Sequence, residues 1–138
     1  MRVILDDNVL IGAFASQGLC HALFELCLDQ HHIVVSEQIL TGVADNLQER
    51  VRLPAWAVEN VIHYLRENAL VERADPPTQR VCRDASDDWI LALAEQSQVD
   101  YVITGDQDLL IVKQHHTTPI VSPRRFWEIL RETDNPPW

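Results

Sequence analysis

Short unbroken runs of branched apolar residues recur along the chain, and between them lie longer stretches in which apolar residues return every three or four positions. The short runs predict strands covered on both faces, and the longer stretches predict amphipathic helices. The predicted strands are residues 3–5, 33–35, 70–71, 101–103 and 120–121. The predicted helices are residues 8–15, 18–30, 36–50, 84–98 and 107–113, with two more that begin at Pro54 and Pro123. Because strand and helix alternate, we expect a three-layer α/β/α fold with a mainly parallel five-stranded sheet.

The length and composition of the chain suit one folding unit. Its 138 residues, 46% of them hydrophobic, can bury one ordinary core. We expect a single domain over residues 1–133 and a C-terminal tail over residues 134–138. No stretch approaches the roughly 20 apolar residues of a membrane span, and no signal-peptide region is visible. Three cysteines without close pairs are typical of a reducing compartment, so we expect a cytoplasmic protein that does not enter membranes.

Acidic residues follow the first and fourth predicted strands and also open the helix before the fourth strand. They are Asp6 after the first strand, Asp87 and Asp88 at the helix start, and Asp106 and Asp108 after the fourth strand. In open α/β sheets, ligands bind in the crevice at the carboxyl ends of the strands. The clusters therefore predict one binding site at that edge. The alternative is that these aspartates only cap or begin the helices that follow them.

The acidic clusters indicate a metal site rather than direct binding of nucleic acid. A formal net charge of −10 and a pI near 4.8 disfavour a protein that holds phosphates by clustered basic residues. Mg²⁺ and Mn²⁺ prefer carboxylate and water oxygens and leave positions open for phosphates. Carboxylates crowded at one edge would repel one another without a cation. The predicted catalytic and metal-binding residues are Asp6, Asp88, Asp106 and Asp108.

Neighbouring polar residues are expected to support this set. Asn8 and Thr104 are uncharged and can orient a carboxylate or a water without adding repulsion, and Asp87 is grouped with them. A cation held there activates water for attack on a phosphodiester, so the reaction needs no nucleophilic side chain. A receiver-like phosphoryl-transfer domain is a further possibility. It is disfavoured because the chain lacks a lone acceptor aspartate at mid-chain followed by a later lysine.

Four segments resemble the PIN-domain family of metal-dependent ribonucleases, in particular the VapC-like toxins of prokaryotic toxin–antitoxin pairs. They are residues 3–11 (VILDDNVLI), 83–94 (RDASDDWILALA), 101–110 (YVITGDQDLL) and 119–130 (PIVSPRRFWEIL). The resemblance implies a sheet in the order 3-2-1-4-5, an acidic pocket that binds Mg²⁺ or Mn²⁺, and hydrolysis of RNA. It also implies a cognate antitoxin as protein partner and a homodimer.

Two positions depart from the pattern of that family. Asp7 stands where a Ser or Thr is usual, and Gly42 stands where a Glu usually supplies the second acidic residue. Asp45 follows about one helical turn later and could supply a carboxylate from a different angle. The site is therefore rebuilt around Asp45, or it works with fewer ligands, or catalysis has been lost. The last alternative predicts a catalytically silent PIN module that binds RNA or a protein partner.

Two kinds of residue are not assigned a role. The adjacent pairs His31–His32 and His115–His116 lie beside or within predicted turns. Neighbouring side chains point apart in an extended chain, so neither pair is expected to bind a metal. Arg50 could contact an RNA phosphate, but its position at a predicted helix end favours an ordinary surface role.

Overall fold

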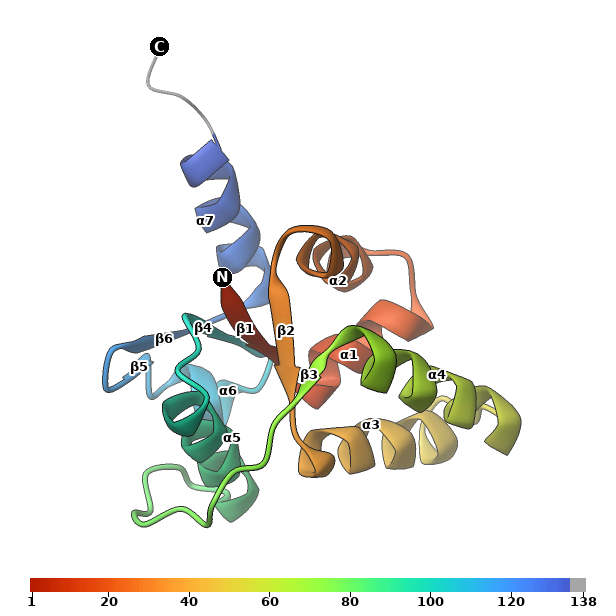
Figure 1. The fold of residues 1–138 in the computed structure, drawn as a ribbon, viewed down its shortest axis with the longest axis horizontal. Helices are drawn as coiled ribbons and strands as arrows, with labels where there is room; N and C mark the ends of the chain where they lie inside the picture. Colours follow the sequence, from red (N-terminus) through yellow and green to blue (C-terminus); the bar gives the residue numbers. More distant parts are fainter. Residues whose placement is uncertain (135–138) are drawn as a thin grey trace.

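The structure is a computed structural model, and it describes residues 1–134. At its centre is a six-stranded sheet in the order β3-β2-β1-β4-β6-β5 (Figure 1). The strands are β1 (Arg2–Leu5), β2 (His32–Val35), β3 (Leu70–Val71), β4 (Tyr101–Ile103), β5 (Gln114–His115) and β6 (Thr118–Val121). All neighbouring pairs except β5 and β6 are parallel. This confirms the predicted α/β class, and the five parallel strands follow the expected order.

The sequence pattern does not predict β5, which corrects the turn expected around residues 115–118. Gln114 pairs with Pro119 and His115 pairs with Thr118, antiparallel to β6. His116 reverses the chain between them with a φ of 52°. Two residues are too few to show a hydrophobic pattern, so β5 is defined by its pairing with β6 rather than by its own sequence.

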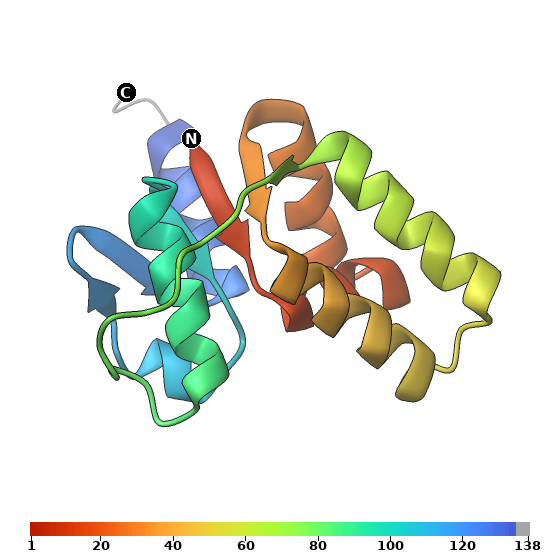
Figure 2. The same ribbon diagram turned by 60° about the horizontal axis from the view of Figure 1, so that its bottom comes forward.

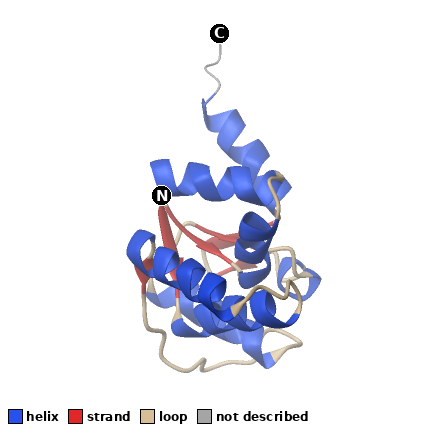
Figure 3. Cartoon of the chain, turned by 90° about the vertical axis from the view of Figure 1, so that its right-hand side faces the viewer, coloured by secondary structure: helices blue, strands red, loops and turns tan. Residues whose placement is uncertain are grey.

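Helices cover both faces of the sheet, as Figure 3 shows from the side. They are α1 (Asp7–Ala15), α2 (Leu19–Gln30), α3 (Glu37–Glu49), α4 (Ala55–Asn68), α5 (Ala85–Gln96), α6 (Gln107–Leu110) and α7 (Pro123–Asp134). Helix α5 lies on one side of the sheet and α2 and α7 lie on the other, while α3 and α4 form an antiparallel pair near β2 and β3 (Figures 1 and 2). Helix α7 includes Asp134, where a tail was expected to begin. The rest of that expected tail, residues 135–138, lies outside the described residues.

The core lies between these layers. The apolar residues of β1, β2 and β4 that the unbroken runs identify are buried, except for the half-buried Tyr101. On α5 the buried residues include Leu91, Leu93 and Ala94, which pack on the sheet as part of the same cluster. Within residues 1–134, no single helix has the length and apolar content to cross a membrane. Helices α1 and α2 meet that test only as a pair, with a bend of 104° between them.

The register of the sheet positions the ends of two strands side by side. Leu5 of β1 is opposite Ile103 of β4, and the strands are parallel. The chain therefore leaves both strands at the same edge, where the next residues are Asp6 and Thr104. The Asp6 backbone N–H donates to the Ile103 carbonyl at 3.0 Å, which continues the ladder into the turn. This edge is where the sequence predicts the binding site.

Candidate metal centre

Asp6 lies where β1 ends and α1 begins, and it is only 3% exposed. Its Oδ1 accepts a hydrogen bond from the Asp7 backbone N–H at 2.8 Å. Its Oδ2 accepts from Thr104 Oγ1 at 2.7 Å and from Asn8 Nδ2 at 3.1 Å. Burial and then the neighbouring Asp7 carboxylate raise the pKa of Asp6 to about 7, against the lowering effect of the Thr104 hydroxyl. Its negative charge is therefore poorly compensated by the protein.

Thr104 and Asn8 tie the ends of β1 and β4 together. Thr104 is fully buried, and its Oγ1 donates to Asp6 while it accepts from the Asp106 backbone N–H at 2.9 Å. Asn8 donates to Asp6, and its Oδ1 accepts from the Gly105 backbone N–H at 3.0 Å. Both residues thus lie against the carboxylate that they are expected to orient. They connect Asp6 to the segment that carries Asp106 and Asp108.

Asp87, Asp106 and Asp108 form the second part of the site. Each offers a carboxylate oxygen, and these three oxygens lie within 4.8 Å of one another. Asp87 is 5% exposed, and its buried Oδ2 has no hydrogen-bond partner. Burial, followed by the charges of Asp106, Asp84 and Asp108, raises the pKa of Asp87 to about 7. An unpartnered buried oxygen beside like charges is unfavourable unless a counter-ion joins them.

This set of donors fits a hard divalent cation. Mg²⁺ and Mn²⁺ bind carboxylate oxygens, and Oδ2 of Asp87 has no hydrogen-bond partner that would compete with an ion. A positive ion would also remove the repulsion among the three carboxylates. Asp6, Asp87 and Asp106 line one groove of about 440 Å³, which Asn46 and Arg50 from the end of α3 also line. The groove is large enough to admit a ligand beside a metal.

The structure does not bring Asp88, a predicted ligand, into this groove. Its Oδ1 accepts from the backbone N–H groups of Val81 at 3.0 Å and Cys82 at 2.8 Å. Its Oδ2 is also buried without a hydrogen-bond partner, but it forms an ion pair with Arg80 Nε at 3.2 Å. Burial raises the pKa of Asp88, but these donors outweigh burial and leave the pKa below its usual value. Successive residues of a helix point about 100° apart, so Asp87 and Asp88 face different sides of α5.

Three aspartates cap helices, as the alternative interpretation expects. Asp6 caps α1, Asp84 caps α5, and Asp106 caps α6 by accepting from the Asp108 backbone N–H at 2.9 Å. Capping alone does not account for Asp87, which caps no helix and is buried without a partner for Oδ2. Helix capping therefore accounts for some of the aspartates at this edge of the sheet and leaves Asp87 to be explained.

Gly42 lies against Asp7, which is absent from the predicted site. A Cβ atom added at position 42 would lie 2.8 Å from Asp7 Oδ2, closer than real Cβ contacts. Asp7 lines the groove beside Asp6 and Asp87, so its carboxylate fills the space where a side chain at position 42 would begin. Asp45 is exposed and is not among the residues that line the groove. Both departures from the family pattern are visible in the sequence, but only the fold puts them in contact.

The two neighbouring aspartates of α5 are expected to respond in opposite ways to the same substitution. At pH 8 without metal, Asp87→Asn should stabilise the protein by about 1–2 kcal/mol, because it removes a buried charge from beside other carboxylates. Asp88→Asn should destabilise it by about 1–2 kcal/mol, because it weakens the acceptor of two backbone N–H groups and the ion pair with Arg80. Chemical denaturation of both variants measures the difference.

The pH dependence of the stability gain from Asp87→Asn is the control for this prediction. The folded protein holds the Asp87 carboxyl at a pKa raised from 3.8 to about 7, so it binds a proton that the unfolded chain releases between those values. Stability is then lost as pH rises through that window. The gain from Asp87→Asn should shrink at about pH 5.5, where the wild-type carboxyl is already protonated. Equal losses in both variants at pH 8 would contradict the geometry given for Asp87.

The chain matches one family model and several solved structures. The model is described as a PIN domain and matches residues 2–108. No curated protein matches the chain. VapBC2 from Rickettsia felis, bound to a DNA fragment from its promoter, has a TM-score of 0.64 and 10% identity over 88% of this chain and 98% of that chain. VapC20 from Mycobacterium tuberculosis, a sarcin-ricin loop cleaving toxin, has a TM-score of 0.57 and 12% identity over 77% and 91%. FitAcB from Neisseria gonorrhoeae has a TM-score of 0.54 and 18% identity over 88% and 98%.

Proposed function

The chain belongs to the PIN-domain family, and on this premise we propose that it is a metal-dependent endoribonuclease, the toxin of a toxin–antitoxin pair. The observation that carries the proposal is the buried Oδ2 of Asp87, which has no hydrogen-bond partner and belongs to a group of three converging carboxylates. Such an arrangement destabilises the folded protein unless a cation binds the carboxylates. The resemblance to VapC-like toxins supports the choice of RNA as the substrate.

Four of the proposed ligands of Mg²⁺ or Mn²⁺ differ at one position from the set that the sequence pattern indicates. They are Asp6, Asp87, Asp106 and Asp108, with Asp87 in place of Asp88, and Asp7 is proposed below as a fifth carboxylate. Asp88 is assigned a positioning role, because its carboxylate holds residues 80–82 against the start of α5. Residues 80–82 themselves do not line the groove that contains Asp6, Asp87 and Asp106.

A divalent cation in this groove supplies Lewis-acid activation of water and neutralises charge on a phosphodiester. The residues of the chain hold the carboxylates in place for it. Thr104 and Asn8 fix Oδ2 of Asp6, and the Thr104 hydroxyl also fixes the backbone at Asp106. Because these residues follow buried strands, their positions are set by the core and need little rearrangement on binding.

We propose that Asp7 supplies the carboxylate that the family usually places at position 42. Its Oδ1 accepts from the Asn8 backbone N–H at 2.8 Å, and Oδ2 lies over Gly42. The glycine is what allows this position, since any side chain there would meet the carboxylate. The carboxylate that the family carries at position 42 on α3 is then replaced by the carboxylate of Asp7 at the start of α1. This supports an active enzyme over the catalytically silent module that Gly42 alone indicates.

The charge of the protein restricts how RNA reaches the groove. At a formal net charge of −10, the surface as a whole repels a polyanion. Arg50 lines the same groove as Asp6, Asp87 and Asp106. We propose that its guanidinium contacts a phosphate of the bound strand, which an Arg can do with two hydrogen bonds. Together with the cation, it would make the groove locally attractive to RNA.

The proposed partner is a cognate antitoxin that covers the acidic groove. VapBC2 and FitAB, whose folds this chain shares, were each solved on a DNA fragment. Their identity to this chain is at most 18%, so they support the fold and leave the partner of this chain as a proposal. A homodimer and a cytoplasmic location stay predictions from the resemblance and the composition.

Cleavage of RNA by the purified protein tests the proposed function. We expect fragments from structured RNA, such as a mixture of tRNA and ribosomal RNA, in the presence of Mn²⁺ or Mg²⁺. Removing the metal with EDTA should abolish cleavage, and adding excess Mn²⁺ back should restore it. A contaminating nuclease is excluded by an Asp106→Asn variant purified in the same way, which should be inactive. If no RNA is cut while Mn²⁺ still raises the melting temperature, the protein is a metal-binding module without this activity.

A further inference from the structure

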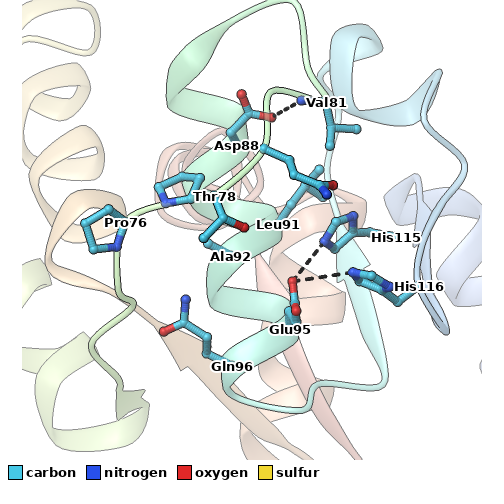
Figure 4. A pocket seen from close by; sticks show the side chains of 12 residues that line it. Pro76, Thr78, Val81, Asp88, Leu91, Ala92, Glu95, Gln96, His115 and His116 are labelled. Carbon is cyan, nitrogen blue, oxygen red and sulfur yellow. Dashed lines mark hydrogen bonds and ion pairs between the residues drawn. The ribbon is translucent and has the colours of Figure 1, made fainter.

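A second group of side chains that carry possible metal ligands lies where the β5–β6 hairpin meets the last turn of α5, and none of them lines the acidic groove. Glu95 Oε2 lies 3.4 Å from His115 Nε2 and 3.5 Å from His116 Nε2. One ligand atom from each residue lies within 4.8 Å of the others. Figure 4 shows both rings turned towards the Glu95 carboxylate. The three residues line a pocket of about 240 Å³ together with Asp88.

The convergence of two adjacent histidines is a property of the turn. In an extended chain, neighbouring side chains point to opposite faces, and on that basis the sequence predicts no shared role. His116 instead has a φ of 52°, in the left-handed region that residues other than glycine seldom occupy. This turns its ring to the side of His115, and the two ring centroids lie 4.4 Å apart. The expectation that this pair points apart is therefore wrong.

The surrounding structure holds these side chains in place. His115 is paired with Thr118 in the hairpin, and its side chain is only 14% exposed. Gln114 Nε2 donates to the His116 carbonyl at 2.6 Å, which fixes the turn. Thr118 Oγ1 donates to the Val99 carbonyl at 3.3 Å, which anchors the hairpin to the segment before β4. The ligand atoms are thus brought together by the fold before any ion binds.

We propose that Glu95, His115 and His116 bind one Zn²⁺ ion or a similar borderline divalent cation, with water as the fourth ligand. Zn²⁺ prefers imidazole nitrogen and carboxylate oxygen in a tetrahedron with bonds of about 2.0–2.2 Å. Ligand atoms at two corners of such a tetrahedron lie about 3.3–3.5 Å apart. The two nitrogen–oxygen distances of 3.4 and 3.5 Å already match that spacing. Three protein ligands and an exposed side leave room for the water.

The nature of the ligands separates this site from the acidic groove. Two imidazoles and one carboxylate favour Zn²⁺ over Mg²⁺, whereas the carboxylate ligands proposed for the acidic groove favour Mg²⁺ or Mn²⁺. The two sites share no residue, although both use α5: Asp87 lies in its first turn and Glu95 in its last. Bound Zn²⁺ would fasten the β5–β6 hairpin to the end of α5. The proposal is therefore independent of the ribonuclease activity.

Simple ion pairing is the alternative, and the chain contains a matched control for it. His63 Nε2 lies 2.9 Å from Glu67 Oε1 on the exposed face of α4, where one histidine and one glutamate are four residues apart. A pair of this kind has one imidazole and cannot complete a Zn²⁺ site alone. His116 is 64% exposed at its side chain and His63 is 73% exposed, so alanine at either position leaves the core intact.

Zn²⁺ binding to the purified protein tests the proposal by calorimetry and by the thermal melt. We expect one tight Zn²⁺ equivalent in the wild type and in Asp87→Asn, which lacks only a carboxylate of the other site. The affinity should fall about 100-fold or more in His116→Ala and in Glu95→Gln, and should be unchanged in His63→Ala. Co²⁺ should give the strong visible absorption of four-coordinate geometry, which His116→Ala should lose. The oxygen ligands of the acidic groove favour six-coordinate Co²⁺, which absorbs weakly.

Three results would overturn the proposal. They are the absence of any Zn²⁺-dependent rise in melting temperature, equal affinity in the wild type and His116→Ala, and Zn²⁺ binding that disappears in Asp87→Asn. The last result would assign the ion to the acidic groove. Loss of RNA cleavage is not part of this test, so failure of the zinc proposal and failure of the ribonuclease proposal are separate outcomes.

Discussion

Replacing Asp87 with asparagine is expected to lower metal-dependent RNA cleavage about 100-fold or more while the fold stays intact. Asp87 lines the groove, and its Oδ2 is buried without a hydrogen-bond partner. Binding of an ion to this oxygen therefore breaks no hydrogen bond. Changing residues that only orient a metal ligand already costs 10–100-fold in metal affinity or activity, and a direct ligand should cost at least as much. The measurement is the initial rate of cleavage of one defined RNA at saturating Mn²⁺.

Asp88→Asn is the decisive comparison, because the sequence pattern assigns Asp88 to the proposed metal site, whereas in the structure Asp87 lines the groove and Asp88 does not. Asp88→Asn should retain most of the cleavage rate at temperatures well below its melting point, with a lower melting temperature than the wild type. Asp45→Asn, on the exposed face of α3, should change neither rate nor stability. If Asp88→Asn is inactive at a wild-type melting temperature while Asp87→Asn is active, the two roles are reversed.

The pattern of apolar residues was sufficient to predict the α/β class because the central strands β1, β2 and β4 are buried on both faces. Val3, Ile4 and Leu5 are fully buried, and their unbroken run is the signal of such a strand. Parallel strands share the edge at which they end, so the position of Asp6 close to Thr104 follows from the order of the strands. β5 carries no such signal, since only its pairing with β6 defines it.

The choice between Asp87 and Asp88 could not be made from the sequence. A sequence pattern that marks the start of a helix cannot distinguish two adjacent acidic residues in the first turn. Which of them faces the groove depends on the rotation of α5 about its axis. That rotation accompanies the burial of Leu91 and Leu93 and the loop at residues 80–82, whose N–H groups capture Asp88. These contacts are tertiary, and no local spacing reports them.

The sequence was also insufficient to predict that the two histidines at the β5–β6 turn converge. Alternation of side chains in an extended chain is a sound rule, and it predicts that His115 and His116 point apart. The rule fails here because His116 adopts a left-handed conformation, which a sequence signals only when glycine or asparagine stands at the position. The turn forms because β5 pairs with β6 on both sides of it.

Exchanging the residues at positions 7 and 42 is expected to move the carboxylate of the site without loss of metal binding. Asp7→Ser should remove most of the Mn²⁺-dependent rise in melting temperature, because it deletes the carboxylate over Gly42. Gly42→Glu alone should displace the Asp7 carboxylate, since its Cβ would lie 2.8 Å from Asp7 Oδ2, and should add a second negative charge beside it. These two effects oppose the gain of about 1 kcal/mol from replacing a glycine within a helix. The double variant should recover both the stability and the response to Mn²⁺.

The sign of the coupling between positions 7 and 42 decides whether Asp7 replaces the carboxylate at position 42. If the substitutions act independently, their effects on the free energy of unfolding add, whereas an exchange of one carboxylate makes the double variant more stable than the sum predicts. Asp45→Ser combined with Gly42→Glu is the control, because Asp45 does not line the groove and should show no such recovery. Recovery in that pair instead would make Asp45 the substitute. A gain of cleavage from Gly42→Glu alone would mean that the native site lacks a ligand and that Asp7 does not replace it.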